Sequence, residues 1–309
     1  MVKDPSSIIP REPLIKLRPY QRAAFRHKLR RLFMLWSRQK GKSFLLGAQG
    51  LDWMMEMQGV LVTFISASIM LGEEILLKEV SVWMQMLEVL RKAADGAGLK
   101  LTSNADGLDF DAVCDIFEHS KLETKLWHTR TICSRSRVIA PNPDTAVGWT
   151  GHIIGDEVGR WPNAQEVFEA ILPIMDSHPE YKMRLATTPP PDDKHYTFTL
   201  FMPPAGITFE HNPMGNWYKS EYGIPCHRVD AWDAHLAGVM LTHPDTKAVC
   251  TPEEHRACFP DKAAWDRNYA LLFLAGGTAA ISLTAISNAQ AKGIGQCLGV
   301  NITEALGAA

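Results

Sequence analysis

One short polar segment, residues 37–43, has the residue types and spacing to bind phosphate. It reads Ser-Arg-Gln-Lys-Gly-Lys-Ser, follows the apolar run 32–36 and precedes the apolar residues 44–46. This order predicts a strand, a tight loop and the start of a helix. The backbone N–H groups of such a loop surround phosphate oxygens at the positive end of the helix dipole. Lys42 would then reach the β- and γ-phosphates of a nucleotide, and the Ser43 hydroxyl would bind Mg²⁺.

The segment departs from the usual phosphate-binding pattern at one position. The Walker A pattern G-x-x-x-x-G-K-[ST] begins with glycine, and Trp36 occupies that position here. A Gly-Lys-Ser tripeptide is common by chance, and a basic turn at the start of a helix is the alternative. The choice between the two depends on a partner motif that supplies carboxylates.

Residues 152–157 provide that partner, of the Walker B type. An apolar strand, His152 to Gly155, is followed directly by Asp156 and Glu157. Asp156 would hold Mg²⁺, directly or through water, and Glu157 would orient and deprotonate the attacking water. The alternative, an Asp-Glu pair in solvent, would have to coincide with the phosphate loop by accident.

Two further segments have a role only beside these motifs. The strand 183–186 ends in Thr187 and Thr188, whose hydroxyls would reach the carboxyl end of the sheet and could sense the γ-phosphate. Gln21 lies upstream of the loop, and one amide can both donate to and accept from an adenine edge. Without the two motifs, the first segment would be interpreted as a strand followed by a proline turn, and Gln21 as a surface glutamine.

The hydrophobic pattern predicts an α/β protein with strands buried on both faces of a parallel sheet. No chemistry is assigned to the less regular residues 95–128. The expected elements are a helix over 21–31, a helix from Lys42 to about Met57, a strand over 60–65, a long helix from about Met70 to Ala94, and one or two strands over 129–140.

The overall composition excludes several classes of protein. Of the 309 residues 46% are hydrophobic and 21% charged, as in soluble globular proteins. The net charge of −2 gives no global signature of nucleic-acid binding, so such binding would need a local patch. The basic cluster within residues 22–31 is one candidate, although a solvated helix face is the preferred interpretation.

The cysteines do not indicate a disulfide framework. The six are scattered without a C-x-x-C pair, which favours reduced thiols in the cytosol. A zinc site is the alternative for one group, although its spacing fits no common finger: Cys226, His227, Cys250, His255 and Cys258. No signal peptide is visible, and the apolar run 269–286 is interpreted as a buried helix or strand pair.

The three landmarks in this order resemble the ATPase domain of the large terminase subunit of tailed bacteriophages, the motor that packages DNA into procapsids. Residues 37–43 resemble the family's deviant phosphate loop, which typically lacks the first glycine and contains Arg-Gln. The other matching segments are residues 17–21 (adenine motif), 137–148 (approach to the acidic motif), 186–189 (coupling motif) and 265–269 with Phe273 (end of the ATPase region, with Asn268 where Glu is common).

The resemblance covers roughly residues 17–285 and implies a P-loop NTPase fold of the ASCE/RecA-like type. That fold is a mostly parallel sheet flanked by helices, with a small second subdomain. The implied division is an ATPase core over 1–205, a lid or linker subdomain over 206–285 and a linker stub over 286–309. Family members continue into a nuclease, but residues 270–309 contain only one acid, Glu304, so no nuclease site is expected here.

The implied activity is Mg-ATP hydrolysis coupled to translocation of double-stranded DNA into a procapsid. A helicase-like ATPase that remodels nucleic acid is the alternative, and a regulatory module with a vestigial site is a third reading. The expected site consists of catalytic Glu157, Lys42 and Arg38; ATP-binding Gln21, Ser37, Arg38, Gln39, Lys40, Gly41, Lys42 and Ser43; metal-binding Ser43 and Asp156; and coupling Thr187 and Thr188.

One departure from the family concerns the arginine that stabilises transition-state charge. Many relatives place it where this chain has Val147. Arg38, inside the loop, is the first choice as its replacement, and Arg160, Arg135 and Arg137 are other options.

The resemblance also implies partners and a location. These are double-stranded DNA, further copies of the chain in a ring (a pentamer on the portal), the small terminase subunit and the portal protein, in the host cytoplasm and without a membrane. ATP and Mg²⁺ are the expected cofactors.

Overall fold

The chain folds around one large sheet. A computed structural model describes residues 13–96, 115–146 and 150–274. Nine strands follow the order β3-β4-β5-β2-β6-β7-β1-β9-β8. Their bounds are β1 Arg31–Trp36, β2 Leu61–Ser66, β3 Phe117–His119, β4 Glu123–Trp127, β5 Cys133–Ile139, β6 His152–Asp156, β7 Met183–Thr187, β8 Asn216–Lys219 and β9 Pro225–Val229.

The middle of this sheet is parallel and its two margins are antiparallel. Strands β5, β2, β6, β7, β1 and β9 run in one direction, while β3, β4 and β8 pair antiparallel with their neighbours. In the central register, Ser66 lies opposite Asp156, and Asp156 lies opposite Ala186. The carboxyl ends of β2, β6 and β7 therefore meet at one edge of the sheet. The predicted fold class, a mostly parallel sheet flanked by helices, is confirmed.

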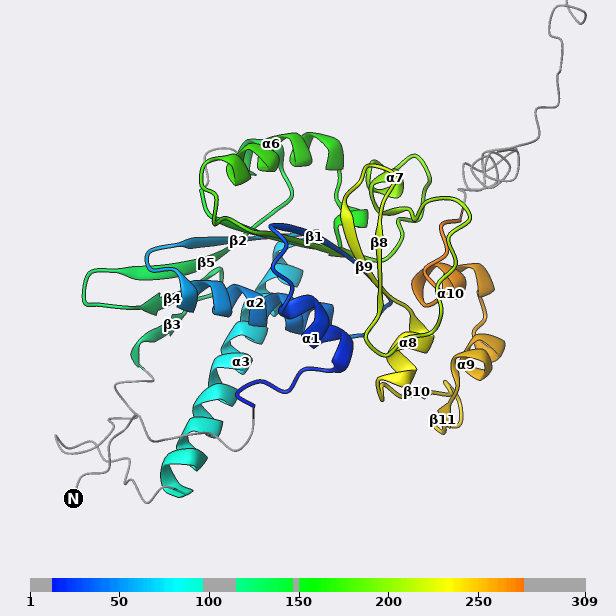
Figure 1. Ribbon diagram of the computed structural model, residues 1–309, viewed down its shortest axis with the longest axis horizontal. Helices are drawn as coiled ribbons and strands as arrows, with labels where there is room; N and C mark the ends of the chain where they lie inside the picture. Colours follow the sequence, from blue (N-terminus) through cyan, green and yellow to red (C-terminus); the bar gives the residue numbers. More distant parts are fainter. Residues whose placement is uncertain (1–12, 97–114, 147–149, 275–309) are drawn as a thin grey trace, which may run out of the picture.

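Helices cover both faces of the sheet (Figure 1). Helices α1, α2 and α3 pack on one face and α6 on the other, and α8, α9 and α10 follow β9. The helices are α1 Pro19–Phe25, α2 Lys42–Glu56, α3 Ile69–Gly96, α5 Pro143–Ala146, a 3₁₀ turn Val158–Arg160, α6 Ala164–Asp176, α7 Thr197–Phe201, α8 Ala231–Leu236, α9 Pro252–Cys258 and α10 Lys262–Asn268. In the described part of the chain, no helix is long and apolar enough to cross a membrane.

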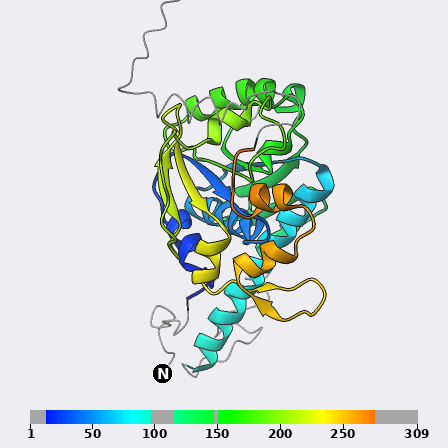
Figure 2. The same ribbon diagram turned by 90° about the vertical axis from the view of Figure 1, so that its right-hand side faces the viewer.

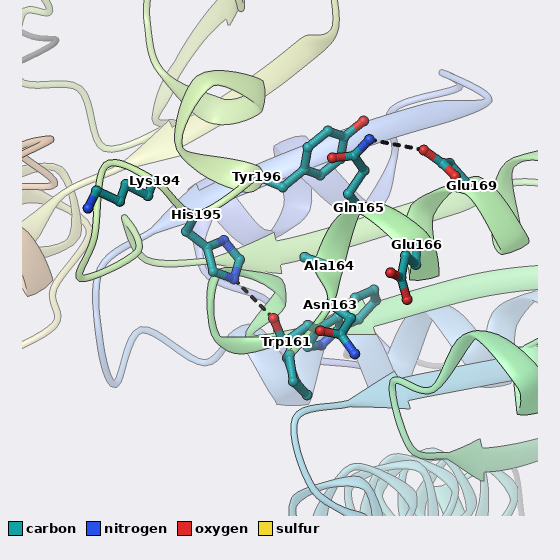
Figure 3. A pocket seen from close by; sticks show the side chains of 10 residues that line it. Trp161, Asn163, Ala164, Gln165, Glu166, Glu169, Lys194, His195 and Tyr196 are labelled. Atoms are coloured by element: carbon teal, nitrogen blue, oxygen red, sulfur yellow. Dashed lines mark hydrogen bonds between the residues drawn. The ribbon is translucent and has the colours of Figure 1, made fainter.

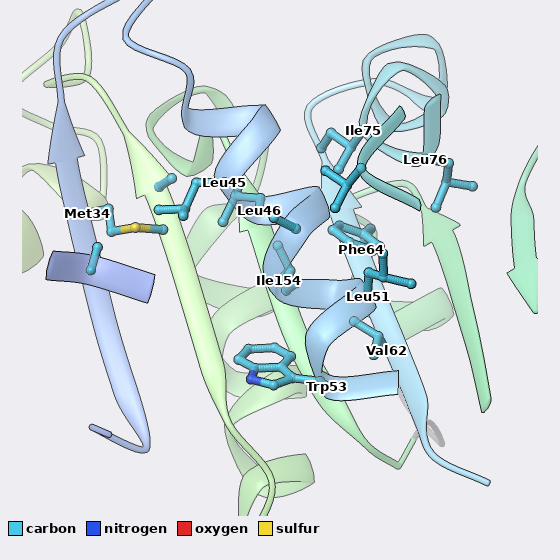
Figure 4. Packing of buried hydrophobic residues seen from close by; sticks show 14 of the residues in the cluster. Met34, Leu45, Leu46, Leu51, Trp53, Val62, Phe64, Ile75, Leu76 and Ile154 are labelled. Carbon is cyan, nitrogen blue, oxygen red and sulfur yellow. The ribbon is translucent and has the colours of Figure 1, made fainter. Parts of the chain in front are cut away.

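Strand β1 shows why a nearly continuous apolar run becomes a central strand. Met34 and Trp36 belong to the core between the sheet and helices α1 to α3, whereas Phe33 and Leu35 belong to the core beneath α6. Because side chains alternate along a strand, a strand covered on both faces needs apolar residues throughout. Figure 4 shows the first core, where residues of α2 such as Leu46 pack between the sheet and α3.

Helices α2 and α3 approach closely around a buried carboxyl group. A Cβ on Gly50 would lie 2.4 Å from Oε1 of Glu79, so only glycine fits at this position of α2. The Glu79 side chain accepts hydrogen bonds from Thr124 (2.6 Å) and Ser136 (2.7 Å). Burial raises the pKa of Glu79 from 4.5 to about 8, and the two hydroxyl contacts offset only part of that effect.

Glu79 should therefore make stability depend on pH. Because its folded-state pKa lies above the unfolded value, its contribution is complete below pH 4.5 and is lost as pH rises through about 8. We expect the free energy of unfolding to fall by about 3 kcal/mol between pH 5.5 and 8.5, and Glu79→Gln to flatten this dependence. Urea unfolding at both pH values measures it, with the exposed Glu74→Gln on the same helix as control. A slope unchanged by Glu79→Gln would contradict the assignment.

Several predicted elements are confirmed and others are wrong. The helix from Lys42, the strand at 60–65 and the long helix to Ala94 correspond to α2, β2 and α3. The helix predicted over 21–31 is wrong, because α1 ends at Phe25 and β1 begins at Arg31. The guanidinium of Arg184 donates hydrogen bonds to the carbonyls of His27 (3.0 Å) and Leu29 (2.9 Å), and these bonds hold residues 27–29 outside the helix. The pattern also missed β3 and β4, which lie at the edge of the sheet.

The alternative of a zinc site also fails. Cys226 and His227 lie in β9 of the main sheet, and both His227 nitrogens have other partners, Trp36 and the carbonyl of Met214. Among the described residues, the group whose ligand atoms lie close enough for a metal is a different one, His211, Asp230 and Asp233. Asp230 and Asp233 already cap α8, and Arg228 pairs with Asp230 (2.8 Å) and lies 3.9 Å from Asp233, so one of their two negative charges is already offset.

The predicted lid, 206–285, contributes to the main sheet. Its residues 216–229 supply β8 and β9, and a small separate core of Ala231, Leu241, Cys250, Trp265 and Ala270 follows. The division into core, lid and linker stays a prediction, and any movable part would begin after β9. Val147, the stub over 286–309 and most of the apolar run 269–286 lie outside the described residues.

Candidate active site

The loop between β1 and α2 has the shape of an anion-binding site. Gln39 and Gly41 have positive φ angles of 57° and 75°, which turn the chain sharply into the first residue of α2. Within the described chain, the N–H groups of residues 39–41 meet no backbone acceptor, and α2 lacks a side-chain cap. The loop therefore presents unpaired donors at a helix N-terminus, as phosphate binding requires.

Glycine is needed at position 41. Besides the positive φ, a Cβ there would lie 2.6 Å from Nε2 of Gln21. That amide nitrogen donates to the Gly41 carbonyl (3.1 Å), and the Gln21 carbonyl oxygen accepts from the Arg18 N–H (3.0 Å). Tyr20 similarly donates to the carbonyl of Lys40 (3.0 Å). The residues before β1 thus hold the loop in place. Gln21 retains one free N–H and one lone pair, and its contact with adenine stays a prediction.

Trp36 does not disturb the loop. Its φ is not positive, so the backbone does not require glycine at this position. The indole points into the core, packs edge-on against Tyr20 (5.1 Å between ring centroids) and donates to Nδ1 of His227 (3.2 Å). Burial lowers the pKa of His227 to about 4, which keeps that nitrogen an acceptor. The carbonyl of Trp36 accepts from Nζ of Lys42 (3.1 Å).

The predicted catalytic pair lies together in the structure. Nζ of Lys42 is 3.1 Å from Oε1 of Glu157, although the two residues belong to different motifs. Glu157 follows β6 with a φ of 49°, a conformation that costs free energy in a residue other than glycine. Its Oε2 atom is buried and has no hydrogen-bond partner. Glu157 therefore has a strained backbone, and one oxygen of its carboxylate has no hydrogen-bond partner and can still act as an acceptor.

The predicted metal ligands are also adjacent. The Ser43 hydroxyl donates to Oδ2 of Asp156 (3.0 Å). Burial, and next the neighbouring Glu157 carboxylate, raise the pKa of Asp156 to about 6. A hydroxyl and a carboxylate are the oxygen ligands that Mg²⁺ prefers, and a cation would relieve the crowding of negative charge. These residues therefore fit a bound Mg²⁺.

The remaining loop residues lie in different environments. Ser37 is buried with an unpartnered hydroxyl, Gln39 is exposed, and Lys40 is buried with its pKa lowered to about 8, first by burial and then by Arg18. Arg38 is half-buried, and its N–H donates to the carbonyl of Asn268 (3.0 Å) at the end of α10. A role for Arg38 on the transferred phosphate stays a prediction.

Thr187 contacts the turn that carries Glu157. Its hydroxyl accepts from the Gly159 N–H (3.0 Å) and donates to the carbonyl of Thr188 (2.7 Å). Both threonines are buried, and the phosphate loop lies on the neighbouring strand, since Leu35 pairs with Thr187. Thr187 is therefore connected to the acidic motif, while its proposed response to the γ-phosphate stays a prediction.

Two positioning contacts were missed from the sequence. The indole of Trp161 donates to the carbonyl of Asp156 (3.0 Å), and Nε2 of His195 donates to the carbonyl of Trp161 (3.0 Å). As Figure 3 shows, His195 points directly at the carbonyl of Trp161. Both residues line a cavity of about 610 Å³ formed by the start of α6 and the loops that follow β6 and β7. The only sequence signal is that both residues follow strands that end in predicted site residues.

The architecture is similar to that of known phage proteins. The ATPase domain of the large terminase of Thermus phage P74-26 matches with a TM-score of 0.51 and 19% identity over 84% of this chain and all of that domain. A mutant of that domain gives a TM-score of 0.53 and 18% identity, over 84% of this chain and 95% of that one. The chain has the fold of a phage large terminase ATPase domain.

The likeness is one of structure rather than of sequence. The large terminase of another thermophilic bacteriophage, in complex with ADP, has a TM-score of 0.50 and 10% identity over 84% of this chain and 54% of that one. No protein-family model and no curated protein matches the sequence. Within the terminase ATPase fold, the four residues that pair across the two motifs lie at the carboxyl edge of the sheet: Lys42, Ser43, Asp156 and Glu157.

Proposed function

We propose that the chain is the ATPase of a phage genome-packaging motor, which couples Mg-ATP hydrolysis to translocation of double-stranded DNA into a procapsid. The observation that carries this is the pairing of Lys42 with Glu157 and of Ser43 with Asp156 in a terminase ATPase fold. The similar terminase in complex with ADP adds support for nucleotide binding.

In this mechanism the unpaired N–H groups of residues 39–41 bind phosphate oxygens, and the Lys42 ammonium moves from Glu157 to the β- and γ-phosphates. Glu157, released from its ion pair, orients the attacking water and accepts its proton on a carboxylate oxygen. Ser43 and Asp156 would hold Mg²⁺, and the ion would supply positive charge beside the phosphates. Arg38 is our choice for the arginine that stabilises the transition state.

Coupling and partners belong to the same proposal. Thr187 would transmit the state of the γ-phosphate to the turn after β6, because its hydroxyl accepts from the Gly159 N–H. Asn268 would transmit the state of the phosphate loop to α10, because its carbonyl accepts from the Arg38 N–H. The motor would act in the host cytoplasm as a ring, a pentamer on the portal, together with the small terminase subunit and double-stranded DNA. Nuclease activity is not expected.

The first experiment measures Mg²⁺-dependent ATP hydrolysis over a series of protein concentrations, with and without double-stranded DNA. We expect turnover per chain to rise with concentration if a neighbouring copy completes the site, and to be independent of concentration if Arg38 acts within one chain. DNA should stimulate hydrolysis in either case. A chain that fails to bind ATP under all conditions would contradict the proposal.

A further inference from the structure

The positive charge of the chain is concentrated in one stretch. Residues 13–51 contain ten Lys and Arg residues and no Asp or Glu, in a chain whose net charge is −2. Arg38, Lys40 and Lys42 of this stretch belong to the phosphate loop. The phosphate loop does not account for another five, which lie closer together in the sequence: Arg22, Arg26, Lys28, Arg30 and Arg31.

All five side chains are exposed; Arg22 lies in α1, and the other four lie at the opposite end of β1 from the nucleotide site. Residues 26–30 connect the end of α1 to the start of β1, so they cross the amino edge of the sheet, whereas the phosphate loop follows its carboxyl edge. The cluster is therefore not the solvated helix face that the sequence favoured. Strand β1, residues 31–36, separates the two sites by about 20 Å, so both can be occupied at once.

The cluster is not neutralised by acidic neighbours. Across residues 13–96, 115–146 and 150–274, none of the five cations forms a salt bridge. Some lysines elsewhere do have partners: Lys92 pairs with Glu88, Lys121 with Glu73 and Lys125 with Glu118. A group of like charges left without partners raises the free energy of the folded protein unless a polyanion binds there.

The backbone of this segment is held firmly. The buried Arg184 binds the carbonyls of His27 and Leu29, and Arg30 donates to the carbonyls of His178 (2.8 Å) and Tyr181 (3.2 Å). Trp217 of the edge strand β8 packs on His27 with 4.4 Å between ring centroids. The cations are therefore presented by an ordered surface, and less conformational entropy is lost when a ligand binds.

We propose that residues 22–31 form the surface that binds the phosphates of double-stranded DNA. The choice of DNA as the polyanion rests on the proposed function. Fully extended, residues 26 to 31 would span at most about 17 Å, a length over which one strand of a duplex carries about five phosphates, and the turn at Arg26 shortens this span. Arginine side chains bind phosphate oxygens in bidentate fashion without reading bases. Because β1 leads from this surface directly into the phosphate loop, DNA contact and nucleotide contact lie on one rigid strand.

The test compares two triple variants with equal loss of charge. The loop variant is Arg26→Gln, Lys28→Gln and Arg31→Gln, which spares Arg22 and Arg30 because both donate to backbone carbonyls. The control is Lys92→Gln, Lys121→Gln and Lys125→Gln, far along the chain. Binding of a duplex of random sequence is measured by fluorescence anisotropy between 50 and 200 mM salt. ATP hydrolysis without DNA is measured on the same samples as a check of the nucleotide site.

The loss of three phosphate contacts should reduce the slope of log K against log salt by about 2.7. The parent should therefore lose about 40-fold more affinity than the loop variant over this fourfold range of salt. The control should keep the parent slope, and hydrolysis without DNA should be the same in all three proteins.

Several results would overturn the proposal. They are an unchanged slope in the loop variant, an equal change in the control, or a parent that binds no DNA. Equal binding of polyglutamate through the same residues would instead indicate an acidic protein partner. None of these results removes ATP hydrolysis without DNA, so failure of this surface and failure of the proposed ATPase function are distinguishable.

Discussion

Replacing Glu157 with glutamine should lower ATP turnover by about 10²- to 10⁴-fold and leave ATP affinity within a few-fold of the parent. Glutamine retains the size of the side chain but cannot accept a proton from water. The predicted metal ligands stay in place, because the bond from Ser43 to Asp156 (3.0 Å) does not involve Glu157. The bond from the backbone N–H of residue 157 to Oδ1 of Asp156 (3.0 Å) is also unaffected by the change.

Single-turnover hydrolysis and an equilibrium titration with ATP separate the two effects. A matched control is Glu166→Gln, which makes the same chemical change in the exposed first turn of α6 and should leave both quantities unchanged. Parent-like turnover in Glu157→Gln would refute the general-base role. A large loss of ATP affinity would show instead that Glu157 organises the binding site.

Much of the fold could be predicted from local patterns. The run from Leu32 to Trp36 is apolar at every position because β1 is covered on both faces, and α2 begins where the Gly41 turn ends. The end of α1 could not be predicted this way. The helix ends there because of Arg184, which is 157 residues from His27 in the chain. The Arg184 guanidinium donates to carbonyls that would accept backbone hydrogen bonds in a longer helix. A local pattern contains no information about such a distant partner.

The candidate site likewise has a part that the sequence predicts and a part that distant contacts decide. Residue types alone indicated that Lys42, Ser43, Asp156 and Glu157 belong together, because phosphate and metal chemistry requires those types. They did not indicate what supports Trp36 at the unusual first position of the loop. That support comes from His227, 191 residues away, and depends on the register that places Trp36 opposite Val229 in β9. Register between distant parallel strands is decided by the whole sheet.

Replacing Lys42 with methionine should weaken ATP binding by about 10- to 100-fold and lower turnover by at least about 10³-fold. The side chain is only 6% exposed, and its ammonium lies between the Trp36 carbonyl (3.1 Å) and Oε1 of Glu157 (3.1 Å), at the junction of the loop and the acidic motif. Methionine keeps the apolar stem and removes the charge. The titration with ATP and the turnover assay measure both losses, with Lys92→Met on the exposed face of α3 as the matched control.

The ion pair also allows a stability test that needs no nucleotide. Lys42→Met leaves the Glu157 carboxylate in a largely buried position without its cation, so we expect a loss of about 1–2 kcal/mol in the free energy of unfolding. Adding Glu157→Gln removes the uncompensated charge, and the double variant should regain most of that stability. A double variant as unstable as the sum of the single changes would show that the 3.1 Å contact has no energetic coupling. Unchanged ATP affinity in Lys42→Met would refute the contact of the Lys42 ammonium with the phosphates.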